Sequence, residues 1–148
     1  MRGKGFGQRV ESLHGKEIAM VKESFFREID QLNSLKSLDP GKINEFADKL
    51  GGLIHHDIAT SQLRRVYGEI KRLQRGATFD AKGLDIFTPR LAFASARKPE
   101  LETIYEVFKR CRPKITNKDK EDLNKFVFII EALVAYHKYH EEKHKRGR

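Results

Sequence analysis

The chain has 148 residues, of which 39% are hydrophobic and 34% are charged, a balance that excludes an intrinsically disordered protein and fits a single domain over residues 1–148. The formal net charge of +9 at pH 7 favours a polyanionic partner such as a nucleic acid, and the single cysteine, Cys111, excludes a disulfide framework or a Cys-x-x-Cys metal site. The sequence contains no run of about 18 apolar residues and no apolar leader, so it predicts a cytoplasmic protein that does not enter a membrane.

The first predicted elements are a basic arm and a helix. Residues 1–10 alternate glycine with cations and carry few apolar side chains, which predicts a mobile arm over about residues 1–12. A frayed end without a function fits this segment equally well. A helix is predicted from about Gly15 to Ser34, where apolar side chains recur at helical spacing, and the turn sequence Asp39-Pro40-Gly41 closes it off.

A second helix is predicted from about Ile43 to His56. Its apolar side chains recur every three or four residues, as expected for the buried side of a helix. They are Ile43, Phe46, Ala47, Leu50, Leu53 and Ile54. The pair Gly51-Gly52 either interrupts this helix or ends it.

The third predicted helix, Thr60 to Arg75, is the basic one. Thr60 and Ser61 carry hydroxyls that can accept hydrogen bonds from the first amides of a helix, and no proline follows. One arc of the helix is apolar and predicts a buried side. Its residues are Leu63, Val66, Tyr67, Ile70 and Leu73.

The opposite arc of this helix carries the cations that point to nucleic acid. These are Arg64, Arg65, Lys71, Arg72 and Arg75. Gly68 lies in the middle of the arc, and a glycine inside a helix costs about 1 kcal/mol relative to alanine. The missing side chain would let a polyanion approach the backbone between the cations. A solvated charged face, with a glycine kept for helix packing, is the alternative interpretation.

A loop is predicted over residues 76–87, with Phe79, Ile86 and Phe87 holding it to the body of the protein. Thr88-Pro89 is a typical helix start and predicts a short helix from Pro89 to Lys98.

Within that short helix two cations flank a small residue, as they do around Gly68. Arg90 and Arg97 share a face with Ala94 between them, and Lys98 lies nearby. This repetition adds the helix to the candidate nucleic-acid surface.

Two more helices complete the predicted fold. The fifth opens at Pro99 and ends before Pro113. The segment Thr116-Asn117-Lys118-Asp119 resembles a capping box and starts the last helix, which is apolar around more than half its circumference and should be central. A mobile, mostly basic tail is expected over about residues 141–148. The sequence therefore predicts an all-α protein, a compact bundle of five or six helices with a long central C-terminal helix.

The sequence gives little sign of catalysis, of a metal or of a cofactor. His137, His140 and His144 fall at helical spacing, but their neighbours are lysines and no further ligands converge on them. Arg9 and His14 match the loose Arg-x4-His pattern of some helical ribonucleases, here in a glycine-rich end. We therefore expect a protein that is not an enzyme, with a helical ribonuclease and an adaptor that binds only proteins as the alternatives.

Three blocks of the sequence carry a family resemblance. TSQLRRVYGEI, TPRLAFASAR and FVFIIEALVAYHKYH lie in this order between about Ile43 and His140. Together they resemble the small subunit of the type III-A CRISPR (Csm) interference complex. The resemblance implies a helical, non-catalytic subunit that acts in antiviral defence. It also implies that copies of the subunit stack along the ribonucleoprotein filament and line the channel in which guide RNA and target RNA pair.

The resemblance also implies partners and site residues. The partners are guide RNA, target RNA, the backbone and large subunits of the complex, and further copies of the chain. The basic residues of the family correspond to Arg64, Arg65, Lys71, Arg72 and Arg97. Combined with the charge pattern, this gives the predicted RNA-binding set: Arg64, Arg65, Lys71, Arg72, Arg75, Arg90, Arg97 and Lys98.

Overall fold

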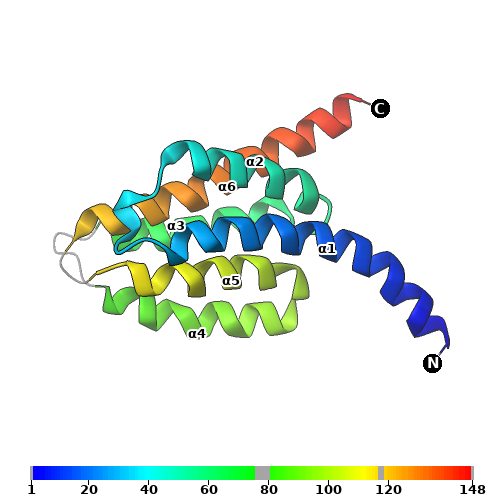
Figure 1. The fold of residues 1–148 in the computed structure, drawn as a ribbon, viewed down its shortest axis with the longest axis horizontal. Coiled ribbons are helices and arrows are strands. Elements are labelled where there is room, and N and C mark those ends of the chain that lie inside the picture. Colours follow the sequence, from blue (N-terminus) through cyan, green and yellow to red (C-terminus); the bar gives the residue numbers. More distant parts are fainter. Residues whose placement is uncertain (1, 76–80, 117–118, 148) are drawn as a thin grey trace.

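The computed structural model describes the backbone of residues 2–75, 81–116 and 119–147, and within these ranges the side chains from residue 13 onward. The described residues form six α-helices and three short 3-10 helices, without a β-strand (Figure 1). The α-helices are α1 (Arg2–Asp30), α2 (Pro40–Ile54), α3 (Thr60–Gln74), α4 (Lys82–Arg97), α5 (Glu102–Cys111) and α6 (Lys120–Arg146). The 3-10 helices span Leu35–Ser37, Pro99–Leu101 and Arg112–Lys114. The all-α prediction is confirmed.

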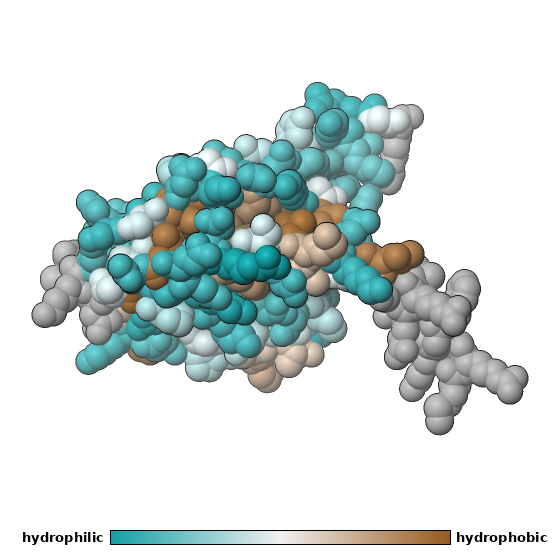
Figure 2. All heavy atoms as spheres, viewed as in Figure 1, coloured by the Kyte–Doolittle hydropathy of each residue, from teal (hydrophilic) through white to brown (hydrophobic). Residues whose placement is uncertain are grey.

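The long C-terminal helix is central, as predicted. α6 packs most extensively against α2 and α3, while α1 lies against α2 and α5, and α5 in turn lies against α4. On α6, Phe126, Ile130 and Leu133 are almost completely buried. Figure 2 shows hydrophilic side chains over most of one face of the bundle, with a band of apolar residues visible between α1 and α2. None of the described helices is both long enough and apolar enough to span a membrane.

Both ends of the chain are more helical than the composition suggested. α1 begins at Arg2 and α6 continues to Arg146, so the backbone of the expected arm and most of the expected tail extend existing helices beyond the bundle (Figure 1). Extending a helix that is already nucleated adds one hydrogen bond for each residue fixed, which favours this continuation. At its other end α1 stops at Asp30, four residues before the predicted Ser34.

The boundary predicted for the fourth helix is wrong. α4 begins at Lys82, so the second half of the expected loop is helical and Pro89 lies inside the helix. The Thr88 hydroxyl donates to the Leu84 carbonyl at 2.8 Å in this turn. Phe87 is buried as expected, but Ile86 is 66% exposed and does not hold the segment to the body. Phe79 lies outside the described residues.

The glycine pair does not interrupt the second helix. α2 runs continuously to Ile54, and Gly51 is buried against α6. A Cβ at Gly51 would lie 2.9 Å from the Tyr136 carbonyl carbon and 3.0 Å from the His137 nitrogen. The backbones of α2 and α6 therefore approach each other at a distance that only glycine allows at this position.

The start of α6 differs from the predicted capping box. Asp119 is the N-cap residue, and its carboxylate accepts a hydrogen bond from the Glu121 amide at 2.9 Å. Thr116 instead donates to Asp122, through its amide at 3.1 Å and its hydroxyl at 3.0 Å. Asn117 and Lys118 lie outside the described residues. Asp122, which is fully buried, thus connects the start of α6 to the segment before it.

Candidate nucleic-acid interface

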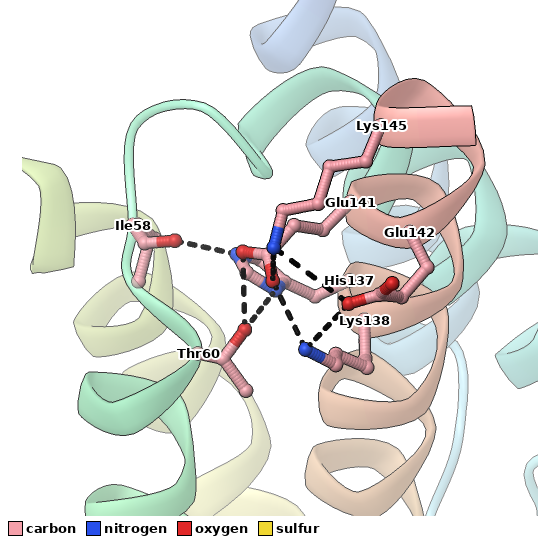
Figure 3. Close-up of polar contacts among 7 residues, drawn as sticks. All are labelled: Ile58, Thr60, His137, Lys138, Glu141, Glu142 and Lys145. Atoms are coloured by element: carbon pink, nitrogen blue, oxygen red, sulfur yellow. Dashed lines mark hydrogen bonds and ion pairs between the residues drawn. The ribbon is translucent and has the colours of Figure 1, made fainter. Parts of the chain in front are cut away.

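The first turn of the basic helix α3 is held against α6 by a polar network (Figure 3). His137 Nε2 donates to the Ile58 carbonyl, and its Nδ1 lies 3.3 Å from the Thr60 hydroxyl. That hydroxyl donates to Glu141 Oε2 at 3.2 Å. The prediction that Thr60 caps the helix is therefore wrong, because its side chain is engaged by α6. Ala59 is the N-cap residue, and its amide donates to the Gln62 side chain at 2.9 Å.

Lysines on α6 keep Glu141 available as an acceptor. Lys138 contacts Glu141 at 3.2 Å and Glu142 at 2.8 Å, and Lys145 lies 3.8 Å from Glu141 (Figure 3). Burial alone would raise the pKa of Glu141, but the hydrogen bonds from Lys138 and Thr60 and the positive charges of Lys138 and Lys145 together outweigh it, and the pKa is lowered. Glu141 is therefore ionised at neutral pH and accepts a hydrogen bond from the Thr60 hydroxyl.

The apolar arc of α3 faces the core as predicted. Leu63, Val66 and Ile70 are buried, while Tyr67 and Leu73 are partly buried against the same core. This packing fixes the rotation of α3 about its axis, and it turns the opposite arc towards solvent.

The five cations of α3 lie on that outward arc. Arg64, Arg65, Arg72 and Arg75 are exposed, and Lys71 is partly buried. Gly68 is also exposed, and a Cβ built there would meet no atom of the described residues within 4 Å. The glycine is therefore not required for packing against any part of the chain that the structure describes.

The cations of α4 meet those of α3 across a groove. The groove has a volume of about 380 Å³, and four of the predicted RNA-binding residues line it. They are Arg65, Arg90, Arg97 and Lys98. The remaining four are not part of this lining and lie along the outward side of α3. They are Arg64, Lys71, Arg72 and Arg75.

Seven of these eight cations have no carboxylate within ion-pair distance among the described residues; the exception is Arg72, 3.7 Å from Glu69. Several cations elsewhere on the protein are in contrast neutralised by pairs between helices. Examples are Lys22–Glu106 at 2.7 Å, Arg110–Asp30 at 3.0 Å and Arg112–Asp85 at 2.8 Å. The positive charge on α3 and α4 is thus left available for an external anion.

Phe93 was missed by the sequence reasoning. This side chain lines the same groove and is 65% exposed, with the Arg97 guanidinium carbon 5.8 Å from the centre of its ring. Its position midway between Arg90 and Arg97 was the available signal, because residues three or four apart lie on one side of a helix. An exposed aromatic ring among cations is a common feature of surfaces that bind single-stranded nucleic acid.

Of the histidines that fall at helical spacing on α6, His137 and His140 have different hydrogen-bond partners, and the His140 and His144 rings both lie near His55. His137 donates to Ile58, whereas His140 Nε2 lies 2.7 Å from Asp48. The His144 ring lies 5.5 Å from that of His55. Among the residues with described side chains, no group of three or more histidine, cysteine or acidic residues is arranged to hold a metal ion.

The other side chains considered for chemistry also have structural surroundings. Cys111 is completely buried, and burial raises the pKa of its thiol, so it acts as a small apolar core residue. The exposed His14 lies 2.9 Å from Asp57 Oδ2. The side chain of Arg9, its partner in the ribonuclease-like pattern, lies outside the described residues.

Comparison with known proteins identifies the family. A model of the family described as Csm2 Type III-A matches residues 36–143, which include α2 to α5, most of α6 and the whole candidate interface. No curated protein and no solved structure matches the chain. The family match covers well over half of the sequence and agrees with the resemblance seen in its three sequence blocks. The chain belongs to the Csm2 Type III-A family and is a small subunit of a type III-A CRISPR complex.

Proposed function

We propose that this subunit binds RNA, without cleaving it, through the surface that α3 and α4 form together. This cationic α3–α4 surface consists of Arg64, Arg65, Lys71, Arg72, Arg75, Arg90, Arg97 and Lys98. The observation that carries the proposal is that seven of these eight side chains lack a carboxylate partner among the described residues. Cations elsewhere on the same chain, such as Lys22 and Arg110, do form ion pairs with carboxylates of other helices. The proposed partner of the seven side chains is the RNA backbone.

The contacts follow from the chemistry of arginine. Its planar guanidinium can donate two parallel hydrogen bonds to a phosphate and can also stack on a base. Contacts to phosphate and ribose position a strand without reading its sequence, which suits a complex whose target is chosen by guide pairing. α3 has 15 residues and is about 22 Å long, enough to run beside several phosphates.

The other subunits of the complex and further copies of the chain are the proposed protein partners. In this arrangement each copy binds guide or target RNA weakly, and stacking along the filament adds the contributions of several copies. Cleavage is assigned to other subunits.

A triple substitution tests the RNA-binding proposal. If about four cations engage a single strand, the log–log dependence of affinity on salt should have a slope near −3. If Arg64, Arg65 and Arg72 are three of these four, changing them to alanine should reduce the slope to about −1 and weaken binding by roughly 10- to 100-fold at physiological salt, equally for unrelated sequences. Fluorescence anisotropy with short unstructured RNAs measures both quantities, and circular dichroism checks that helicity is retained.

The control removes the same charge elsewhere. Lys16, Lys42 and Lys120 are exposed on α1, α2 and α6, and changing them to alanine also lowers the formal charge from +9 to +6. This variant should keep most of the affinity, because its cations lie outside the cationic α3–α4 surface. Equal losses in the two triple variants would show that net charge, and not this surface, attracts the RNA. A wild-type chain with no salt-sensitive RNA affinity would favour the adaptor that binds only proteins.

Gly68 gives a second test with two readouts. The variant Gly68→Ala should raise the free energy of unfolding by roughly 1 kcal/mol, because alanine favours the helix and its Cβ meets no described atom within 4 Å. If the strand approaches the backbone at this point, the same methyl group should weaken RNA binding. Thermal unfolding and anisotropy report the two effects separately. A more stable variant with unchanged RNA affinity would exclude close approach of the strand at Gly68.

A further inference from the structure

The groove between α3 and α4 has a composition that phosphate contacts alone do not explain. Val66, Leu91 and Ala94 are among its apolar lining residues, while the cations Arg65, Arg90, Arg97 and Lys98 also border it. Its volume of about 380 Å³ falls in the range of roughly 300–1,000 Å³ that is common for small-molecule sites. An occupant that satisfies both parts needs an apolar body and a negative charge.

We propose that this groove takes up one unstacked nucleobase of the bound RNA, with the ring of Phe93 as its stacking partner. A nucleotide is the occupant of matching chemistry, since it joins a flat aromatic ring to a phosphate within one residue. The base lies on the apolar lining, and its flanking phosphates contact the cations at the edge. This inference rests on the proposed RNA-binding function and adds a base contact to it.

Phe93 is placed for this role. Its ring is 65% exposed, so burial in the core does not account for it, and it borders the groove next to Arg97. Stacking on an aromatic side chain is tolerant of sequence, because every base has a π-face. The contact therefore remains compatible with a subunit that does not read sequence.

The negative charge of Glu69 favours entry of the base, and not of the phosphate, into the groove. Glu69 also lines the groove, and its carboxylate, which lies 3.7 Å from Arg72, would disfavour a phosphate placed there more than an uncharged base. A base avoids this repulsion, and the carboxylate can accept a hydrogen bond from an exocyclic amino group. The sugar–phosphate chain consequently stays at the edge of the groove, near the cations.

The test uses the full chain and a short single-stranded RNA in which one 2-aminopurine is flanked by abasic ribose, so that its fluorescence falls only when the base stacks on the protein. The wild-type chain should quench this fluorescence, and Phe93→Ala should abolish the quenching and weaken binding by about tenfold. The same substitution should leave affinity unchanged for an RNA whose bases are replaced by abasic ribose. Ile86→Ala is the matched control, because Ile86 is 66% exposed on the same helix and does not line the groove.

The possible outcomes separate this inference from the proposed function. Salt-sensitive RNA binding with no quenching, or with equal losses for normal and abasic RNA in Phe93→Ala, would overturn the base site and leave the RNA-binding function standing. Loss of another subunit from the assembled complex, with RNA affinity unchanged, would show that the groove holds a protein side chain instead. If the wild-type chain binds no RNA, both the RNA-binding function and the base site are wrong. Thermal unfolding of Phe93→Ala should match that of wild type.

Discussion

Replacing Asp122 with alanine is expected to lower the free energy of unfolding by about 3 kcal/mol. The carboxylate is fully buried and accepts hydrogen bonds from the Ser34 hydroxyl, from the Lys36 amide at 2.8 Å, and from the amide and hydroxyl of Thr116. Alanine removes the acceptor for all of these donors. The effect is large because the interaction joins three separate segments: the 3-10 helix after α1, the chain before α6, and the first turn of α6.

Urea unfolding followed by circular dichroism measures this loss. Glu131→Ala is the matched control, because Glu131 is an exposed carboxylate on the same helix. It should change the free energy of unfolding by less than about 0.5 kcal/mol. A loss below about 1 kcal/mol in the Asp122 variant would contradict the view that this network holds the start of α6.

The hydrogen bonds to Asp122 also predict how the free energy of unfolding changes at acidic pH. Burial alone would raise the pKa of Asp122, but the hydrogen bonds from Ser34, Lys36 and Thr116 outweigh it and lower the pKa. The folded state therefore binds this proton less readily than the unfolded state. The resulting stability is complete above the unfolded pKa of about 3.9 and is lost as the pH falls through the lower folded value. Asp122→Asn, which does not titrate, should show a smaller loss of stability than wild type over this acid range.

Much of the fold could be predicted from the sequence because most of its helices have one apolar side. The spacing of Leu63, Val66 and Ile70 gave both the position and the rotation of α3. A helix boundary is predicted wrongly where the same local sequence occurs both at helix starts and inside helices. Proline starts many helices, so Thr88-Pro89 indicated a boundary, yet α4 accommodates Pro89 inside the helix.

Two polar residues on the apolar side of α6 show a different limit. Asp122 and His137 are in phase with buried neighbours such as Phe126 and Leu133, and both are completely buried. Helical spacing reveals that such residues face the core, but partners such as Ser34 and Ile58, which lie 88 and 79 residues away, follow only from the tertiary structure. His137 was considered as a metal ligand because it falls at helical spacing with His140 and His144, and its contacts to Ile58 and Thr60 give it a structural role.

Only the part of the candidate interface that lies on a single helix could be predicted from the sequence. Helical spacing placed the cations of α3 on one arc, and the structure shows them outward. The groove depends on how α3 and α4 lie relative to each other. Residue spacing within one helix gives no information about this arrangement. The proposed role of Phe93 rests on its place beside Arg97 at this groove, which only the structure shows. Contact with RNA stays a prediction.

Gly51→Ala is expected to lower the free energy of unfolding by about 2 kcal/mol, even though alanine is the better helix former. The added Cβ would lie 2.9 Å from the Tyr136 carbonyl carbon, 3.0 Å from the His137 nitrogen and 3.1 Å from the Tyr136 oxygen. These are backbone atoms that cannot rotate away as a side chain can. The helices α2 and α6 must therefore separate, and overpacking of this kind typically costs about 1–3 kcal/mol.

Gly52→Ala is a control that the chain itself provides. The three atoms nearest to a Cβ at Gly52 would belong to the His140 ring, at 3.4 Å or more, which is ordinary contact. The gain in helix propensity should then dominate, and stability should stay equal or rise by up to about 1 kcal/mol. Opposite effects of the same substitution at adjacent positions would confirm the close approach of α2 and α6. Similar effects at both positions, measured by urea unfolding, would contradict it.

The consequence of Gly51→Ala should also reach the candidate interface. His137, whose backbone nitrogen the new methyl group displaces, is the residue that donates to Ile58 just before α3. Shifting it loosens the network that holds Thr60, so the first turn of α3 should lose protection in hydrogen exchange while the buried turn around Ile70 keeps it. Because that first turn leads into Arg64 and Arg65, RNA affinity should fall although no cation has been removed. Uniform loss of protection along α3 would instead indicate global destabilisation, without a specific link between Gly51 and the start of the basic helix.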